Sequence, residues 1–174
     1  MKSKTKSLVL CALFAALTAV CSQIALTLPI TQVPFNLATL AVFLAGGLLG
    51  ASAGFVSLLV YVLMGAIGIP VFAQFSGGFQ ILIGPTGGYI VGFVVGAWVT
   101  GLVVERFAKR GFFVYVLAMV CGLIACYALG TIWYMFLTKI NLTVALMSCV
   151  IPFLPVDALK IILAAFLCTR LHKH

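Results

Sequence analysis

The sequence contains few charged residues, and almost none of them is acidic. Charged residues make up 7% of the 174 positions, against about 25% in an average soluble protein. The acidic side chains are Glu105 and Asp157 alone, whereas hydrophobic residues make up 65% of the chain. This composition excludes a soluble globular enzyme, a disordered protein and a secreted disulfide scaffold. We therefore expect an integral membrane protein.

The chain also lacks the clusters that metal binding or catalysis would need. Its six cysteines stand singly in apolar segments without C-x-x-C spacing, and its two histidines, His172 and His174, end the sequence. A metal site needs convergent ligands, and a serine–histidine protease within the membrane needs a histidine there. The stretch from Gly84 to Gly88 lacks the lysine of a phosphate-binding loop. We expect no metal, no cofactor and no enzymatic activity, including ATP hydrolysis.

Long apolar runs predict helices that cross a membrane. A bilayer core of about 30 Å needs roughly 20 helical residues, and the alternation of a transmembrane β-barrel is not visible. The run from 37 to 69 is too long for one helix, and the glycines from Gly46 to Gly54 could form a tight turn in its middle. We predict an all-α integral membrane protein, a single domain over residues 1–174 with six transmembrane helices, at approximately 8–28, 37–50, 52–69, 84–104, 111–137 and 144–171.

The basic residues favour six helices over five and predict the orientation. With six helices, eight bases fall on the side of the N-terminus and Lys139 falls on the other, while Lys160 lies within a helix. With five helices, the bases after residue 104 would move outside. Because basic residues are enriched in cytoplasmic segments, we expect both termini in the cytoplasm and no nucleic acid as a partner. The eight bases are Lys2, Lys4, Lys6, Arg106, Lys109, Arg110, Arg170 and Lys173.

The first apolar run could alternatively be a signal peptide, because three lysines precede it. Its length over residues 8–28 exceeds the usual hydrophobic region of about 7–15 residues. Val20 is also too large for the position before Cys21 in a lipoprotein cleavage site. We therefore predict that this segment is a retained helix.

One pair of opposite charges lies within the last apolar run. Asp157 and Lys160 are three residues apart, so on a helix they share a face. Each charge within a membrane span costs at least about 2.5–3.5 kcal/mol on insertion scales, and such residues are a functional hypothesis by default. The pair could bind a small polar solute that arrives from outside, or it could be an ion pair that fixes the orientation of the helix.

Small residues form stripes on several predicted helices. Gly46-x-x-x-Gly50-x-x-x-Gly54 and Gly88-x-x-x-Gly92-x-x-x-Gly96 allow close helix contacts. Such stripes can serve packing within the bundle or docking of another membrane protein. The first helix is the better candidate for docking, because its alanines would form a flat surface. These alanines are Ala12, Ala15, Ala16 and Ala19.

Several of these motifs together resemble the BioY family, over nearly the whole chain. They are the run from Gly65 to Ala73 (GAIGIPVFA), Gly77-Gly78, the run from Gly84 to Tyr89 (GPTGGY), and Pro152-Phe-Leu-Pro155-Val-Asp157-x-x-Lys160. BioY proteins are the biotin-binding S components of energy-coupling factor (ECF) transporters. The alanines of the first helix match the small-residue motif by which S components dock on their partner.

The resemblance implies a division of labour between this chain and its partners. A six-helix S component in the plasma membrane of a prokaryote would capture biotin from outside. A transmembrane coupling subunit and two cytoplasmic ATPases would supply energy, and the S component would topple in the membrane to deliver the ligand inward. Two alternatives stay open, a solitary biotin facilitator of the same fold, and a structural membrane protein in which Asp157 and Lys160 are only an orientation lock.

The chemistry of biotin suits the polar and aromatic residues near the predicted outer side. Asp157 could accept the N–H groups of the ureido ring, and Lys160 could donate to its carbonyl or neutralise the carboxylate. The sequence leaves open which residue holds the carboxylate. Aromatic side chains could pack on the rings and sulfur, and amides and a hydroxyl could form secondary hydrogen bonds. These further candidates are Phe72, Phe75 and Tyr89, and then Asn36, Gln74, Gln80 and Thr86.

Overall fold

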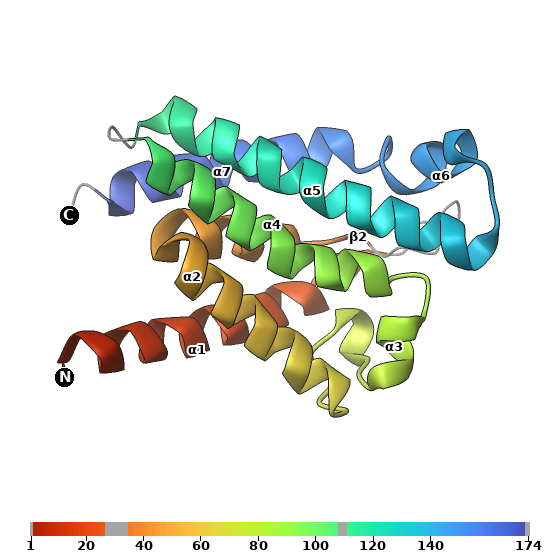
Figure 1. Ribbon diagram of the computed structural model, residues 1–174, viewed down its shortest axis with the longest axis horizontal. Helices are drawn as coiled ribbons and strands as arrows, with labels where there is room; N and C mark the ends of the chain where they lie inside the picture. The colour runs from red at the N-terminus through yellow and green to blue at the C-terminus, as the bar shows by residue number, and fades with distance from the viewer. Residues whose placement is uncertain (1, 27–34, 108–110, 173–174) are drawn as a thin grey trace.

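The computed structural model describes residues 2–26, 35–107 and 111–172, and over these residues the chain is almost entirely helical (Figure 1). This confirms the predicted all-α class. A two-stranded antiparallel sheet and a 3-10 turn are small additions. The elements are α1 (Lys2–Gln23), β1 (Ala25–Leu26), β2 (Phe35–Asn36), α2 (Ala38–Ala66), η1 (Ala73–Phe75), α3 (Phe79–Ile83), α4 (Gly87–Arg106), α5 (Phe112–Thr138), α6 (Leu142–Cys149) and α7 (Leu154–Leu171).

The helices are long and apolar enough for a membrane. Within the described residues, four helices (α1, α2, α4 and α5) meet the length and composition of a membrane span. Helices α6 and α7 together meet them as a fifth if this pair, bent by 54°, counts as one span. Their outward faces carry large apolar side chains that would be costly in water, such as Leu13, Ile124 and Ile162. The chain is therefore a multi-pass membrane protein, while the count of six spans stays a prediction.

Helix α2 is interrupted at Gly50. This residue has φ +82° and ψ −176°, which an L side chain rarely adopts. The chain folds back there and brings residues on both sides of Gly50 together. A Cβ atom on Gly54 would lie only 3.2 Å from the Cα of Gly46, eight residues earlier. The backbone N–H of Ala51 donates to Oε1 of Glu105 at 2.9 Å, so a carboxylate caps the start of the second half. The break lies inside the glycine-rich stretch from which the sequence predicts a turn.

Other helix bounds differ from the sequence-based prediction. The first helix ends at Gln23 rather than 28, since the chain enters β1, and residues 27–28 lie outside the described part. The second half of α2 ends at 66 rather than 69, and α4 begins at 87 rather than 84, after the separate helix α3. The predicted helix 144–171 is two helices, α6 and α7. Pro152 lies in this break and Pro155 lies in the first turn of α7. Proline disfavours helical backbone in the residue before it, so Pro152 favours an end of the helix there.

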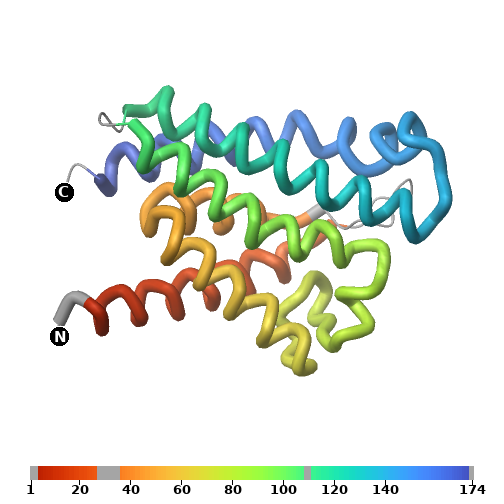
Figure 2. Tube along the Cα trace, viewed as in Figure 1, coloured from red at the N-terminus to blue at the C-terminus, as the bar shows by residue number. Residues whose placement is uncertain are grey.

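Glycines bring α4 close to α5. A Cβ atom on Gly92 would lie 3.0 Å from the carbonyl oxygen of Cys126, and one on Gly96 would lie 3.1 Å from that of Gly122. The stripe on α4 therefore serves packing within the bundle. Helix α4 lies between α2 and α5, and α1 packs along α2 (Figures 1 and 2).

The two ends of the helix bundle differ in the elements that they carry. The start of α1, the end of α4, the start of α5 and the end of α7 lie together at one end (Figure 1). The other end carries η1, α3, α6 and the start of α4. Lys4, Lys6, Arg106 and Arg170 belong to the helix ends of the first group. The cytoplasmic orientation of that end stays a prediction.

Candidate substrate-binding site

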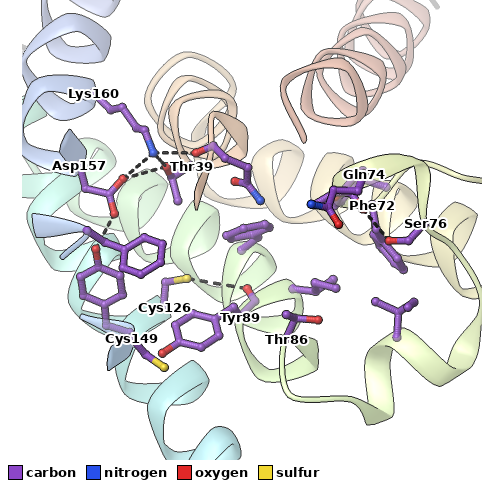
Figure 3. A pocket seen from close by; sticks show the side chains of 18 residues that line it. Thr39, Phe72, Gln74, Ser76, Thr86, Tyr89, Cys126, Cys149, Asp157 and Lys160 are labelled. Carbon is purple, nitrogen blue, oxygen red and sulfur yellow. Dashed lines mark hydrogen bonds and ion pairs between the residues drawn. The ribbon is translucent and has the colours of Figure 1, made fainter. Parts of the chain in front are cut away.

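A cavity of about 290 Å³, whose lining side chains are drawn in Figure 3, lies toward the end of the molecule that carries η1, α3 and α6 (Figure 1). Its lining comes from the start and the end of α2, the segment from Phe72 to Ser76, the start of α4, the middle of α5, and α6 with α7. This volume is close to the lower end of the range for small-molecule sites, about 300–1,000 Å³. Seven predicted site residues line it, namely Asn36, Phe72, Gln74, Thr86, Tyr89, Asp157 and Lys160.

The ion pair forms one end of this cavity. The Lys160 Nζ atom lies 2.8 Å from the Asp157 Oδ1 atom, and both side chains are almost completely buried. Asp157 stands in the first turn of α7, where the helix dipole stabilises a carboxylate. The spacing of three residues thus places both groups on the face of α7 that points into the bundle.

Two residues from other helices complete a network around the pair. The Thr39 hydroxyl donates to Asp157 Oδ1 at 3.1 Å, and the Tyr127 hydroxyl donates to Asp157 Oδ2. Lys160 Nζ donates to Thr39 Oγ1 at 3.0 Å and to the carbonyl oxygen of Asn36 at 2.7 Å. With Asp157, these acceptors match the three protons of an ammonium group. The network therefore joins α2, α5 and α7.

The network still offers an acceptor to a ligand. A carboxylate oxygen can accept two hydrogen bonds. Asp157 Oδ1 accepts from Lys160 and from Thr39, while Oδ2 accepts from Tyr127. Asp157 Oδ2 therefore has capacity for an N–H donor of a ligand in the cavity. The Lys160 ammonium group donates to three oxygen atoms of the network and balances the charge of Asp157.

Aromatic rings line the space between the two ends of the cavity. Phe72 and Tyr61 meet edge to face with ring centroids 5.6 Å apart, and the Tyr61 hydroxyl is hydrogen-bonded to Ser22 of α1 at 2.7 Å. The Tyr89 hydroxyl lies 3.3 Å from Thr131 Oγ1. Rings whose polar tips are satisfied elsewhere present their apolar faces to a ligand. Phe93 and Phe153 extend this wall.

The end opposite the ion pair is formed by the segment 72–76. Figure 3 shows Gln74 and Ser76 on the far side of the cavity from Asp157 and Lys160. Phe72 N–H donates to the Ser76 carbonyl at 3.0 Å, and Ser76 Oγ donates to the Ala73 carbonyl at 2.7 Å. These contacts close the segment into a small loop.

Two predicted site residues do not line the cavity. Phe75 is 73% exposed, and Gln80 is exposed and donates to the Gly77 carbonyl beside it. The tight loop at 72–76 leaves Phe75 exposed, and Gln80 is exposed on α3, so neither side chain belongs to this cavity. A role of either residue in ligand binding stays a prediction. Asn36 contributes its backbone carbonyl, while its side-chain oxygen accepts from Ala38 N at the start of α2.

The alanines of α1 differ in how deeply they are buried. Ala15 is 1% exposed and Ala19 packs partly buried against the core, so these two belong to the bundle. Ala12 and Ala16 are exposed. The four alanines share one face of α1, with Ala15 and Ala19 on its side toward the bundle and Ala12 and Ala16 on its exposed side. The role of the four alanines in docking stays a prediction.

Several residues that line the cavity carry no distinct signal in the sequence. Thr39, Tyr61, Ser76 and Tyr127 are hydroxyl residues in ordinary positions, and only the packing of distant helices brings them together. Among residues 2–26, 35–107 and 111–172, no group of three or more His, Cys, Asp or Glu side chains could hold a metal.

Comparisons with known proteins identify the family and the fold of the chain. The model of the BioY family matches residues 1–174. The biotin transporter BioY of Thermotoga maritima is 40% identical over 97% of this chain and 96% of its own length. A probable biotin transporter BioY of Pyrococcus horikoshii is 41% identical over 98% of each chain. A solved structure of the S component for biotin from an ECF-type ABC transporter superposes with a TM-score of 0.93 and 26% identity, over 99% of this chain and 94% of that one.

Proposed function

The chain belongs to the BioY family, and we propose that it binds biotin in the cavity beside Asp157 and serves its uptake as the S component of an ECF-type transporter. The relatives described above are named as transporters, so the chain is a transporter protein and not an enzyme. The observation that carries the proposal is a buried, paired carboxylate with a remaining acceptor position in a ligand-sized cavity.

The ureido ring of biotin complements the end of the cavity that holds the charges. Its N–H groups are donors, and Asp157 Oδ2 can accept one of them beside the Tyr127 hydroxyl. A hydrogen bond to a charged group contributes about 1.5–3 kcal/mol, more than one between neutral groups. This contact therefore favours a ligand with an N–H donor over an isosteric ligand without one.

The carboxylate of biotin then points to the segment 72–76. Lys160 already donates to Asp157, Thr39 and Asn36, which disfavours it as the partner of a second carboxylate. Gln74 and Thr86 line the opposite part of the cavity and supply neutral hydrogen-bond donors. This orientation differs from the alternative in which Lys160 neutralises the biotin carboxylate.

The rings and the sulfur of biotin suit the aromatic middle of the cavity. A thioether makes favourable contacts with aromatic ring edges. Tyr61, Phe72 and Tyr89 present such rings between the two polar ends. The order of polar, aromatic and polar surfaces in the cavity follows the order of groups along the biotin molecule.

Energy for uptake must come from partners. We propose a transmembrane coupling subunit and two ATPase subunits, because the chain lacks the lysine of a phosphate-binding loop. Ala12 and Ala16 form the small-residue surface that remains exposed on α1, and we propose this surface for contact with the coupling subunit.

Calorimetric titration of the detergent-purified protein tests the proposed ligand. We expect tight binding of biotin, and loss of binding in Asp157→Asn. Biotinamide, which lacks the carboxylate charge, should bind within about tenfold of biotin if neutral groups hold that end. A protein that is free of bound vitamin and gives no heat with biotin would contradict the proposal.

Uptake in cells tests the proposed partners. Cells that express this chain without the coupling subunit and the ATPases should accumulate little biotin, whereas cells with the complete set should accumulate it. Equal uptake in both would favour a solitary facilitator. Large residues at the exposed surface, as in Ala12→Leu with Ala16→Leu, should reduce uptake in the complete system without changing biotin binding.

A further inference from the structure

Gln23, the last residue of α1, contacts the cavity-lining segment 72–76 but does not itself line the cavity. Its Nε2 atom donates to the carbonyl oxygen of Phe72 at 3.1 Å, with a longer contact to that of Pro70 at 3.4 Å. Its Oε1 atom accepts from the backbone N–H of Phe75 at 2.8 Å. One amide side chain thus binds both ends of the turn between residues 72 and 75.

This turn has a backbone that its residues rarely adopt. Gln74 has φ +59° and Phe75 has φ +54°, both in the left-handed region, and neither is glycine. Residues with a Cβ atom enter this region at a cost, except for Asn and Asp, which tolerate it better. Two such residues in succession persist only where surrounding contacts hold them.

Gln23 supplies a contact that holds this backbone from outside the loop. The hydrogen bonds between Phe72 and Ser76 and between Ser76 and Ala73 lie within the segment and do not involve Phe75 N–H. The Phe72 ring is anchored separately, since it is 1% exposed and packs on Tyr61. Loss of the Gln23 side chain would therefore release Phe75 and Gln74 while Phe72 stays in place.

We propose that Gln23 is a positioning residue for the substrate, which holds the segment 72–76 across the cavity and thereby sets how long biotin stays bound. The inference rests on the proposed function, because it concerns release of the same ligand. Gln74 and Ser76 form the end of the cavity opposite Asp157 (Figure 3), so relaxation of this segment opens that end and leaves the charged end intact.

The test measures dissociation of labelled biotin from the purified protein. Gln23→Leu removes both hydrogen bonds and should accelerate dissociation about tenfold, since each neutral hydrogen bond contributes about 0.5–1.5 kcal/mol and 1.4 kcal/mol corresponds to tenfold. Gln23→Glu keeps the acceptor for Phe75 N–H but places oxygen against the Phe72 carbonyl, and should give an intermediate rate. Thr138→Val is the matched control, because Thr138 ends α5 and donates to Tyr134 of its own helix.

A second substitution separates positioning from general stability. Phe75→Asn places at an exposed position a residue that tolerates left-handed backbone. Added to Gln23→Leu, it should slow dissociation at least threefold relative to the single variant. The thermal midpoint of Gln23→Leu should equal that of Thr138→Val within a few degrees.

The outcomes are distinguishable. An unchanged dissociation rate in Gln23→Leu, with normal biotin binding by the unmodified protein, would overturn the role of Gln23 alone. Faster dissociation that Phe75→Asn does not slow, together with a lower thermal midpoint, would also overturn it, because the residue would then be structural. Absence of biotin binding by the unmodified protein would overturn the proposed function and this inference with it.

Discussion

The two ends of the cavity are formed by different kinds of structure. At one end, Asp157 and Lys160 project from α7 and are fixed by hydrogen bonds from α2 and α5. At the other end, Gln74 and Ser76 belong to a short loop with left-handed backbone. The first end is a buried network on three helices, and the second is a loop held by the side chain of Gln23.

This difference assigns different roles to the two ends. A buried network that joins three helices by hydrogen bonds cannot move without loss of several contacts at once, so it suits recognition of one chemical group. A loop with few buried contacts opens at low cost in free energy. The helical end should therefore determine which ligand binds and how tightly, while the loop end should determine how fast the ligand exchanges.

The largest expected effect is removal of one charge at the helical end. Asp157→Leu leaves the Lys160 ammonium group buried and unpaired, which should lower the free energy of unfolding by about 3–5 kcal/mol and abolish biotin binding. Thermal unfolding and calorimetric titration in detergent measure both effects.

The double variant separates ligand recognition from an orientation lock. Asp157→Leu with Lys160→Met replaces the ion pair by apolar side chains, so most of the lost stability should return. Biotin binding should stay absent, because the acceptor for the ureido N–H is missing. Recovery of binding in the double variant would contradict a role of Asp157 in recognition.

A smaller effect on biotin binding is expected when Asp157 stays and only a hydrogen bond to it is removed. Tyr127→Phe removes the hydroxyl that donates to Asp157 Oδ2. Since hydrogen bonds to charged groups contribute about 1.5–3 kcal/mol, the affinity for biotin should fall by roughly ten- to a hundredfold. Tyr134→Phe on the same helix α5 is the control and should change it less than about twofold. Equal effects of the two variants would refute the network as the basis of affinity.

A substitution at the loop end should lower the affinity for biotin less than one at the helical end, and it should act mainly on the dissociation rate. Gln74→Ala removes a neutral donor that lines the cavity. We expect a two- to tenfold loss of affinity, in line with about 0.5–1.5 kcal/mol for a neutral hydrogen bond, and this loss should lie in the dissociation rate. Stopped-flow measurement with a fluorescent biotin analogue would check it. A slower association rate with unchanged dissociation would contradict this role for the loop.

The smallest effect is expected outside the cavity. Gln80 is a glutamine in the same glycine-rich and aromatic segment as Gln74. Its side chain is exposed and donates a hydrogen bond to the nearby carbonyl oxygen of Gly77. Gln80→Ala should change biotin affinity less than about twofold by calorimetry. An effect as large as that of Gln74→Ala would mean that the ligand extends beyond the cavity to α3.

The sequence predicted features of the fold and the site where a charged residue or a cluster of glycines interrupts an apolar run. Charges in an apolar helix are costly, so Asp157 and Lys160 stand out without a structure. A glycine-rich stretch in an apolar run likewise indicated the interruption at Gly50. The prolines at 152 and 155 carried a comparable signal for the break between α6 and α7, which the prediction of one continuous helix overlooked.

The remaining parts of the site depend on tertiary contacts. Thr39 and Tyr127 are common residues for their helices, and their convergence on Asp157 over separations of 118 and 30 residues follows from helix packing. The choice between Gln74 and Gln80 depends on the backbone of a loop whose shape involves a contact with Gln23, far away in the sequence. The residues around Gln74 in the sequence give no sign of a hydrogen bond between Gln23 and Phe75, which lie 52 residues apart.

A crystal structure of the protein with biotin tests the central claim most directly. We predict the ureido ring at the helical end, with one N–H within hydrogen-bond distance of Asp157 Oδ2, and the carboxylate beside Gln74 and Ser76. The opposite orientation, with the carboxylate against Lys160 and the ureido ring at the segment 72–76, would contradict the division of roles between the two ends.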